Sequence, residues 1–492
     1  MWLVNIVLPW VFVNKVIIEN FKSIRHLELD LKPGINLLVG PNAGGKTNIL
    51  EAIHFLYEAL VKEAGKIPYL PHSPRYWSPL DLFYMRDPNN MPSIGLSMEC
   101  YFGDKTSTTS SKRSKPIKKT RKNLYKMNLT FTVSFQFRSD MNTIIPAAHT
   151  IDVSNKTTMM ISLDGVTVKI DREFMNKVLA KRLSKEVREK LESTYELEEN
   201  VYVKRLAWKK DIPRLFAPSI LVSLPGILNV VSSDIGIVRI FAPVLTETGR
   251  EEILFPVYLE KCEKPRGLFF EDVLPIPEME HAPKEFIGTV IERMLLLRHP
   301  DIGSLREPKQ FTGETRLNER ATNLAPVLLA LQGRRGGIPD RILTAFAKLF
   351  PGLSIRLNTQ FGRVALMAEE DGLELPPSNM PDGAIKLLAI LTAIEFSPSL
   401  LLIDEIENSM HARMLEYIVD ELNSLSVPVI VATHSPIMVD LVGAERTILV
   451  CKDKEKGTVI ERISDPEKLS EKLEKLGLSL SDYVFYKKTY EM

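Results

Sequence analysis

The order of hydrophobic and polar residues predicts a strand-rich beginning for this chain. Residues 14–20 and 26–39 alternate as strands do, and the second run ends in the unbroken apolar stretch 35–39, as expected of a buried strand. A Gly-rich loop follows at 40–47. Residues 48–60 then have a helical period, with a single apolar face made by Ile49, Ile53, Leu56 and Leu60.

The middle of the chain has weaker patterns. Short strands are predicted at 94–102, 127–137 and 159–170, and a helix at 172–195, where apolar residues recur every four positions. Residues 196–282 are interrupted by prolines and give no assignment. Residues 283–298 are predicted as another amphipathic helix.

From residue 321 onward, helical and strand patterns alternate. Helices are predicted at 322–331, 338–350, 383–396, 410–424 and 466–475, and strands at 400–403 and 427–432, with strand pairs in 353–368 and 447–462. This alternation predicts a parallel α/β layer. The sheet-forming strands 400–403 and 427–432 are apolar throughout, as strands covered on both faces are.

Composition indicates a globular protein of a reducing compartment. Of 492 residues, 45% are hydrophobic and 25% are charged, and the net charge is +1, so the whole chain is not a basic nucleic-acid binder. The three cysteines, Cys100, Cys262 and Cys451, form no CxxC pair, which argues against a disulfide framework or a zinc site. The apolar segment 1–13 is too short to span a bilayer, so we expect a cytoplasmic protein with no membrane role.

One segment has the chemistry of a phosphate-binding loop. The run Gly40-Pro41-Asn42-Ala43-Gly44-Gly45-Lys46-Thr47 fits GxxxxGK[ST] and lies between a predicted strand and a predicted helix. Glycines let backbone N–H groups close around a phosphate, and the helix N-terminus favours negative charge. We expect Lys46 to bridge the β- and γ-phosphates of ATP and Thr47 to bind Mg²⁺.

Two later strands end in polar residues that complete such a site. The strand 400–403 delivers Asp404, expected to hold Mg²⁺, and Glu405, expected to orient and deprotonate the attacking water as the catalytic base. The strand 427–432 ends at Thr433 and His434, and His434 is predicted to sense the γ-phosphate. All these residues must meet in one pocket, although the loop and the acidic pair lie near opposite ends of the chain.

Together these segments resemble the ABC-type ATPase heads of the SMC, RecF and OLD class. The resemblance extends to Ile18–Ile24, to Asn48–Ile53 and to Asp404–His411, and covers roughly 14–60 and 320–492. It implies a P-loop NTPase head of the α/β class, with an antiparallel β subdomain, a mostly parallel sheet core and an inserted helical or mixed region. It also implies that Lys22 and Asn48 contribute to nucleotide binding, and that two heads dimerise through the nucleotide.

The family has a signature loop that contacts ATP bound to a second subunit. Here Asp382 and Gly383 match the Asp-Gly pair of that loop, whereas Pro381 stands where the family has Ser. Pro has neither hydroxyl nor N–H. Ser409 likewise replaces the Gly that this subgroup usually has in the loop that crosses the dimer. The glutamine of the family's glutamine loop is not identifiable, and Gln136 is a weak candidate.

We therefore predict an apolar extension at 1–13, an N-terminal ATPase lobe at 14–170, an inserted region at 171–320 and a C-terminal ATPase lobe at 321–492. No sustained heptads support a coiled coil, and too few residues follow His434 for an OLD-type nuclease domain. The basic stretch from Lys112 to Lys126 either binds nucleic-acid backbone or is a solvated loop.

Two functions remain open from the sequence. One is an ATPase of DNA repair, maintenance or defence that contacts double-stranded DNA. The other is an ATPase subunit that gates a separate nuclease or toxin without touching DNA. A transporter subunit is disfavoured, because no membrane-docking helix is recognisable and the two halves of the head lie far apart in the chain.

Overall fold

The structure of the chain is a computed structural model. It describes residues 11–62, 78–103, 124–140, 142–162, 165–180, 185–207, 226–232, 235–246, 249–258, 260–262, 274–275, 286–314 and 316–488. The chain divides into two compact units. The first contains Met1–Lys22, Glu28–Asp30 and Phe55–Glu292, and the second contains Ser23–Leu27, Leu31–His54 and Arg293–Met492. Most of the basic stretch lies outside the described residues.

The first unit is built on an antiparallel sheet. Its strands are ordered β1 (Val11–Phe21), β4 (Ser93–Gly103), β5 (Leu124–Arg138), β6 (Thr143–Val153), β7 (Thr157–Ser162), β8 (Gly165–Asp171), β10 (Val201–Ala207) and β9 (Glu196–Glu198). Alternate residues of β5, Phe131, Val133 and Phe135, are buried, as a sheet with one covered face requires. The predicted strands at 94–102 and 127–137 are confirmed by β4 and β5.

Further strands and short helices complete this unit. A three-stranded sheet contains β11 (Gly226–Ser232), β12 (Ile235–Thr246) and β13 (Gly249–Tyr258). The other elements are β14 (Glu260–Cys262), β15 (Leu274–Pro275), η1 (Glu58–Lys62), η2 (Pro79–Leu82), η3 (Tyr84–Arg86), α2 (Arg172–Leu179), α3 (Lys185–Thr194) and α4 (Phe286–Glu292). The predicted single helix at 172–195 is thus two helices, because α2 ends at its C-cap Ala180. The predicted strand at 159–170 is likewise two, β7 and β8, which pair as a hairpin.

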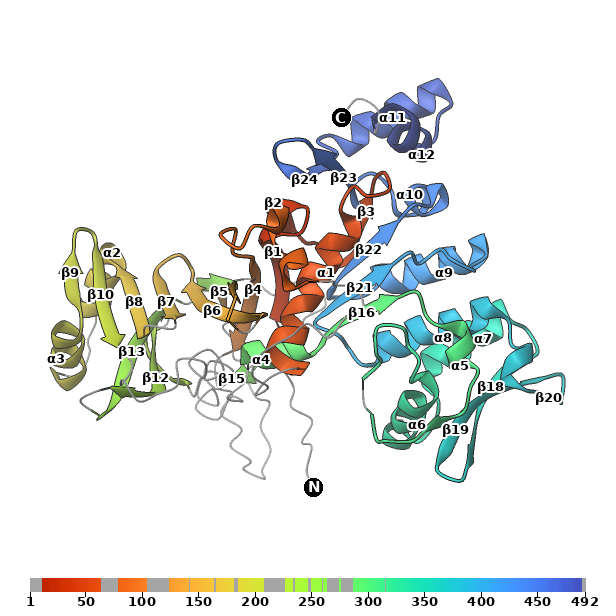
Figure 1. Cartoon of the computed structure of the whole chain (residues 1–492), viewed down its shortest axis with the longest axis horizontal. Helices are drawn as coiled ribbons and strands as arrows, with labels where there is room; N and C mark the ends of the chain where they lie inside the picture. The colour runs from red at the N-terminus through yellow and green to blue at the C-terminus, as the bar shows by residue number, and fades with distance from the viewer. Residues whose placement is uncertain are drawn as a thin grey trace, which may run out of the picture. The chain divides into compact units, whose positions relative to one another are not determined.

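The second unit contains a mostly parallel sheet. Its strands run in the order β16 (Met294–Arg298), β21 (Leu400–Asp404), β22 (Pro428–Thr433), β3 (Gly34–Val39) and β23 (Thr447–Asp453), all parallel, followed by the antiparallel β24 (Gly457–Arg462). Gly457, the first residue of β24, pairs with Ile24 at the start of β2 (Ile24–Asp30). Figure 1 shows β3, in red, beside β22, in blue, so segments from opposite ends of the chain are neighbours in one sheet.

The second unit also contains helices, and four strands of its sheet, β16, β21, β22 and β3, are buried at every residue. The helices are α1 (Lys46–Tyr57), α5 (Ile302–Leu305), α6 (Leu324–Arg335), α7 (Asp340–Leu349), α8 (Asp382–Glu395), α9 (Ala412–Asn423), α10 (Pro436–Val442), α11 (Pro466–Leu476) and α12 (Leu480–Asp482). One apolar core joins β16, β21, β22 and β3 with α6 to α10. The predicted apolar face of the first helix is confirmed, since Ile49, Ile53 and Leu56 are fully buried.

A small antiparallel sheet and short helices fill out the second unit. The sheet contains β17 (Lys309–Gln310), β18 (Leu353–Gln360), β19 (Arg363–Glu370) and β20 (Leu373–Leu375). A 3₁₀ helix, η8 (Pro377–Asn379), and a π-helix, η9 (Tyr483–Lys488), also belong to this unit. The strand pair expected in 353–368 is β18 and β19. Among the described residues, no helix has both the length and the apolar character that crossing a bilayer needs.

The predicted helix at 283–298 is wrong in its second half. The described part is helical only in α4, and the chain then enters β16, which lies parallel to β21 with every residue buried. Leucines in the run Met294–Arg298 satisfy a helical period as readily as they fill a doubly covered strand. The length of such a short apolar run, rather than its periodicity, favours a strand.

His149 gives the first unit a built-in sensitivity to acid. The ring is only 1% exposed in β6, and its two nitrogens have no hydrogen-bond partner among the described residues. Burial lowers the pKa of His149 to about 3. The unfolded chain takes up this proton near pH 6.5, whereas the folded chain does not until far lower pH. Folding stability contributed by neutral His149 is therefore lost as pH falls from about 6.5 toward 3, at about 1.4 kcal/mol per pH unit.

We expect His149→Phe to flatten the acid limb of the stability curve. The wild-type chain should lose about 2 kcal/mol of unfolding free energy between pH 6.5 and 5 through this residue, and the variant should not. Urea unfolding at the two pH values measures the difference, with His26→Asn, at an exposed position, as the control. Equal pH dependence in wild type and His149→Phe would contradict the assignment.

Candidate nucleotide site

The phosphate loop leaves β3 through positions that only glycine can occupy. A Cβ added at Gly40 would lie 1.9 Å from the Val450 carbonyl oxygen. At Gly45, φ is +111° and an added Cβ would lie 2.1 Å from Thr458 Oγ1. The loop is therefore pressed against β23 and β24, which hold its backbone in one shape. Its outer residues, Pro41, Asn42 and Ala43, are exposed and open to a ligand.

Lys46, the first residue of α1, is buried within this loop. Its side chain is only 5% exposed, and Nζ donates to the carbonyl oxygens of Gly40 at 2.7 Å and Pro41 at 3.0 Å. Burial lowers the pKa of Lys46 to about 8, against the opposing effect of Asp404, Glu405 and Glu407. An anion in the loop would give this partly desolvated cation an oppositely charged partner.

A hydroxyl network ties the loop to β24. The Thr458 and Ser23 hydroxyl oxygens lie 2.7 Å apart, and Thr458 Oγ1 donates to the Gly44 carbonyl at 3.2 Å. Asn48 Nδ2 donates to Ser23 Oγ at 2.7 Å. Asn48, which the family resemblance places at the nucleotide, thus also anchors the loop from behind. Thr458 was not predicted from sequence because no local pattern links it to residues more than 400 positions away.

Thr458→Val is expected to weaken ATP binding about three- to tenfold, because an isosteric methyl leaves the loop carbonyl of Gly44 and the Ser23 hydroxyl without this partner. Thr458→Ser retains the hydroxyl and should bind ATP within about twofold of wild type. Calorimetric titration with a non-hydrolysable ATP analogue measures both. If the Val and Ser variants bind alike, the hydroxyl does not shape the loop.

Thr47 and Asp404 come together as a metal-binding pair would. Thr47 Oγ1 donates to Asp404 Oδ2 at 3.3 Å, across 357 positions of sequence. Parallel pairing explains the meeting, because β3 and β21 both flank β22 and end at the same edge of the sheet. A hydroxyl and a carboxylate oxygen side by side are the hard ligands that Mg²⁺ prefers, so these residues fit the ion.

Asp404 is also held from behind by Arg298. Arg298 Nε donates to Asp404 Oδ2 at 3.1 Å, and Arg298 Nη1 donates to Glu51 Oε1 of α1 at 2.7 Å. All three side chains are 9% exposed or less. Arg298 was missed in the sequence because residues 283–298 were predicted as a helix, which does not end at the sheet edge.

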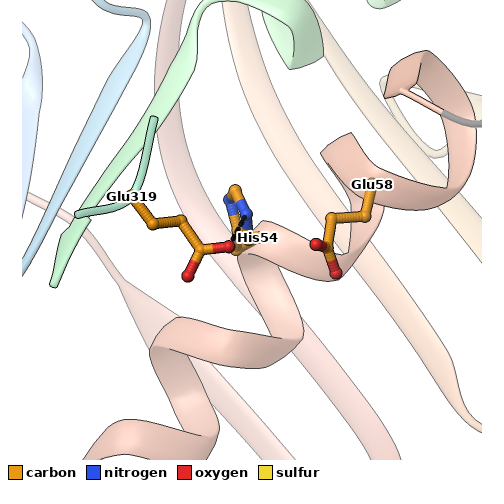
Figure 2. Close-up of side chains that lie close together, drawn as sticks. All are labelled: His54, Glu58 and Glu319. Atoms are coloured by element: carbon orange, nitrogen blue, oxygen red, sulfur yellow. Dashed lines mark hydrogen bonds and ion pairs between the residues drawn. The ribbon is translucent and has the colours of Figure 1, made fainter. Parts of the chain in front are cut away.

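A second contact joins α1 to the segment after β16. His54 Nε2 lies 3.0 Å from Glu319 Oε1, as Figure 2 shows. The backbone carbonyl of Glu319 accepts from the Arg298 N–H at 2.7 Å. The His54–Glu319 pair therefore helps to fix both α1 and the end of β16, and with them the carboxylate that Arg298 contacts.

Glu405 begins a strained loop at the end of β21. Its φ is +51°, and its N–H donates to the Ala432 carbonyl of β22 at 2.9 Å. The carboxylate Oε2 accepts from Asn408 Nδ2 at 2.7 Å and lies 3.5 Å from His299 Nδ1. Left-handed backbone at a non-glycine residue costs free energy, and strained residues of this kind cluster at functional sites. Glu405 is half-buried, so its carboxylate can meet water.

Lys386 of α8 is hydrogen-bonded to the loop that begins at Glu405. Its Nζ donates to the carbonyl oxygens of Glu405 at 2.9 Å and Asn408 at 2.8 Å, and the side chain is nearly fully buried. Burial lowers the pKa of Lys386 to about 8, while Glu407 and Glu405 raise it. Lys386 was not singled out in the sequence, although it follows Gly383 by only three residues.

His434 lies directly after β22, beside the phosphate loop. The sheet register pairs Thr433 with Val39, so His434 and Gly40 leave adjacent strands together. Its N–H donates to Glu407 Oε1 at 2.9 Å. Burial, and then Lys46, lower the pKa of His434, which favours the neutral imidazole. A neutral ring can still donate one hydrogen bond to a phosphate oxygen.

The signature-like loop opens α8 and contacts the loop that follows Glu405. Arg306 holds it, donating to Asp382 Oδ1 at 2.6 Å and to the Met380 carbonyl at 2.8 Å. Pro381 is the N-cap and makes no side-chain hydrogen bond. A Cβ at Gly383 would lie 3.0 Å from the Ser409 carbonyl, so glycine allows the two loops to touch. Ser409 itself has φ +62°, which explains why glycine is usual there.

The predicted site residues are therefore distributed as follows. The phosphate loop, Thr47, Asp404, Glu405 and His434 all lie at the carboxyl edge of the second unit's parallel sheet. Lys22 belongs to the first unit, where its N–H donates to the Leu82 carbonyl, and its part in nucleotide binding stays a prediction. Gln136 lies in β5 of the first unit, and its role also stays a prediction.

This loop, sheet order and set of polar strand ends define a P-loop ATPase with an ABC-type head like those of SMC and RecF proteins. Comparison with protein families agrees. Residues 12–215 match the model described as "AAA ATPase domain", and residues 271–440 match "AAA domain, putative AbiEii toxin, Type IV TA system". Residues 216–270 lie between the two matches.

Curated relatives share only a short stretch with this chain. DNA replication and repair protein RecF of Roseiflexus castenholzii is 44% identical over 54 residues, which is 11% of this chain and 14% of the relative. RecF of Lactococcus lactis subsp. lactis is 56% identical over 39 residues, 8% and 11% of the two lengths. The chain thus matches well under a fifth of the length of these relatives.

Among solved structures, an Smc head domain from Pyrococcus furiosus, bound to the C-terminal domain of ScpA, aligns with 95% of this chain and 100% of its own. Its sequence identity is 13% and its TM-score is 0.40. An SMC head domain from Thermotoga maritima aligns with 92% of this chain and 100% of its own, at 10% identity and a TM-score of 0.35.

Proposed function

We propose that this chain hydrolyses ATP with Mg²⁺, and that ATP closes two heads which hydrolysis reopens, in DNA repair, maintenance or defence. The observation that carries the proposal is the Thr47–Asp404 hydrogen bond at 3.3 Å, which joins the phosphate loop to the acidic strand end. The RecF relatives support the DNA-related part of the proposal.

The chemistry follows from the residues at the sheet edge. Loop N–H groups and Lys46 hold the phosphates. Glu405 accepts a proton from water as the water oxygen bonds to the γ-phosphorus and the bond to the bridging oxygen breaks, which leaves ADP and phosphate. Mg²⁺ on Thr47 and Asp404 would neutralise charge on the phosphate oxygens. Neutral His434 would donate to the γ-phosphate.

Closure of two heads depends on the signature loop, where Pro381 stands in place of the Ser of the family. Pro381 supplies neither a hydroxyl nor an N–H to a nucleotide on a second subunit. Asp382 and Gly383 remain, with Gly383 placed against the Ser409 loop. We propose that these two residues make the contact across the dimer, and that ATP-driven closure is weaker than in heads that have Ser in place of Pro381.

A second candidate function is that of an ATPase subunit gating a separate toxin or nuclease. The observation that favours it is the toxin–antitoxin description of the family model matched by residues 271–440. In this case the nucleotide cycle is the same, but the state of the heads is read by another protein rather than by DNA.

ATPase rates with and without double-stranded DNA separate the two functions. A DNA-acting ATPase should be stimulated, and neutralising the basic residues between Lys112 and Lys126 should remove both the stimulation and the salt-dependent binding. Neutralising Lys468, Lys472 and Lys475 of α11 is the matched control. An unstimulated rate with no salt-dependent DNA binding favours the effector-gating function.

A further inference from the structure

Arg298 lies between two buried carboxylates at the metal end of the site. The parallel register pairs Arg298, the last residue of β16, with Asp404, the last residue of β21. The guanidinium contacts both carboxylates: Nε donates to Asp404 Oδ2 at 3.1 Å, and Nη1 donates to Glu51 Oε1 at 2.7 Å. The third nitrogen, Nη2, is buried and has no hydrogen-bond partner among the described residues.

The charge on this cluster depends on Arg298. Two carboxylates this deeply buried can both stay ionised only if a cation compensates them. Among the described residues, Lys46 also interacts electrostatically with Asp404, but its ammonium donates to the carbonyls of Gly40 and Pro41. Arginine keeps its charge at all physiological pH values, so the pair always has a resident cation.

The oxygen atoms around Arg298 are also those that a divalent cation would seek. Glu51, Asp404 and the Thr47 hydroxyl would together offer two carboxylates and a neutral oxygen, and Thr47 donates to the same Oδ2 that Arg298 contacts. Without the guanidinium, such a group should attract a divalent ion from solution with no nucleotide present. With the guanidinium in place, one of the two negative charges is already compensated.

We infer that Arg298 is a positioning residue that acts as the resident cation of the Glu51–Asp404 pair, and so makes divalent-metal binding depend on nucleotide. This inference rests on the proposed magnesium role of Thr47 and Asp404. In the bare head, Arg298 matches the charge of Asp404 and fixes its carboxylate. Nucleotide phosphates then supply the additional negative oxygens that metal binding requires.

Mn²⁺ titration of the nucleotide-free chain, followed by electron paramagnetic resonance, tests the inference without ATP turnover. Wild type should take up little Mn²⁺, and R298M should bind it at least about tenfold more tightly, because a unit positive charge a few ångströms from the ion has been removed. R298K retains the charge and should behave as wild type. The double variant E51Q/R298M should lose the gained affinity, since one of the two carboxylates is gone.

Thermal unfolding supplies a second readout that a purely structural role would not produce. Mn²⁺ should raise the melting temperature of R298M, and should leave wild type and E51Q/R298M unchanged, because only a bound ion stabilises the folded state. If R298M folds poorly, refolding it with Mn²⁺ should restore it. The inference is overturned if R298M gains no Mn²⁺ affinity, or if nucleotide-free wild type binds Mn²⁺ equally well.

The proposed function can fail separately. Binding of a fluorescent ATP analogue to wild type, measured in the presence of Mg²⁺, reports on the nucleotide site alone. No binding there, combined with a gain of Mn²⁺ by R298M, would remove the ATPase proposal and leave the charge-matching role of Arg298 in place. Normal ATP binding by wild type, combined with no gain of Mn²⁺ affinity by R298M, would overturn the proposed role of Arg298 and leave the ATPase proposal in place.

Discussion

Glu405→Gln is expected to lower the rate of ATP hydrolysis at least about a hundredfold while ATP affinity changes less than about threefold. The amide has the shape of the carboxylate and can still accept a hydrogen bond from Asn408 Nδ2, but it cannot take a proton from water. The left-handed backbone at Glu405 and its N–H bond to Ala432 are unaffected by the change. Chemistry is therefore lost and binding is retained.

Single-turnover hydrolysis and analogue binding measure the two quantities separately, and size-exclusion chromatography with ATP reports whether the variant accumulates as a dimer. Glu416→Gln on the exposed side of α9 is the matched control and should turn over ATP as wild type does. A Glu405→Gln variant with the wild-type hydrolysis rate would show that another residue is the general base.

Lys46→Ala is expected to reduce ATP affinity at least about a hundredfold, because the variant loses the one cation enclosed by the loop and charge-assisted bonds to phosphate are strong when buried. The fold should survive the change. Lys46 is a desolvated ammonium whose pKa burial lowers to about 8, so a methyl group in its place removes a buried charge from the folded state.

Binding of a fluorescent ATP analogue measures the loss, and thermal unfolding without nucleotide provides the check on folding. We expect the melting temperature of Lys46→Ala to equal or exceed that of wild type, whereas Lys472→Ala, at an exposed position of α11, should change neither quantity. Retained affinity in Lys46→Ala would place the triphosphate somewhere other than this loop.

The parts of the site that the sequence predicts are those with local signatures. The phosphate loop is recognisable from the spacing of its glycines and from the strand and helix that flank it. Asp404 and Glu405 are recognisable because they end an apolar strand. Arg298 and Thr458 carry no such signature. Each acts on a residue more than a hundred positions away, and only the order of strands in the sheet brings them together.

The fold was predictable where strands and helices alternate with clear periods. It was not predictable between 196 and 282, because the sequence there is interrupted by prolines and has neither a helical nor a clean alternating period. The misassigned segment 283–298 shows the related ambiguity of short leucine-rich runs. There, burial on both faces of β16 decides the conformation, and burial is a property of the neighbours rather than of the run.

Lys386 links two surfaces that the proposed cycle uses at different moments. It lies one turn after Asp382 and Gly383 in α8, and its Nζ donates to the carbonyls of Glu405 and Asn408. In the proposed cycle, Glu405 acts on the nucleotide of its own head, and Asp382 and Gly383 contact the nucleotide of the second head. Lys386 connects the two regions, so they should move together. A shift of the Glu405 loop after phosphate release from one head would then move α8 and weaken its contact with the nucleotide of the second head. Hydrolysis in one subunit would therefore be enough to separate the two heads.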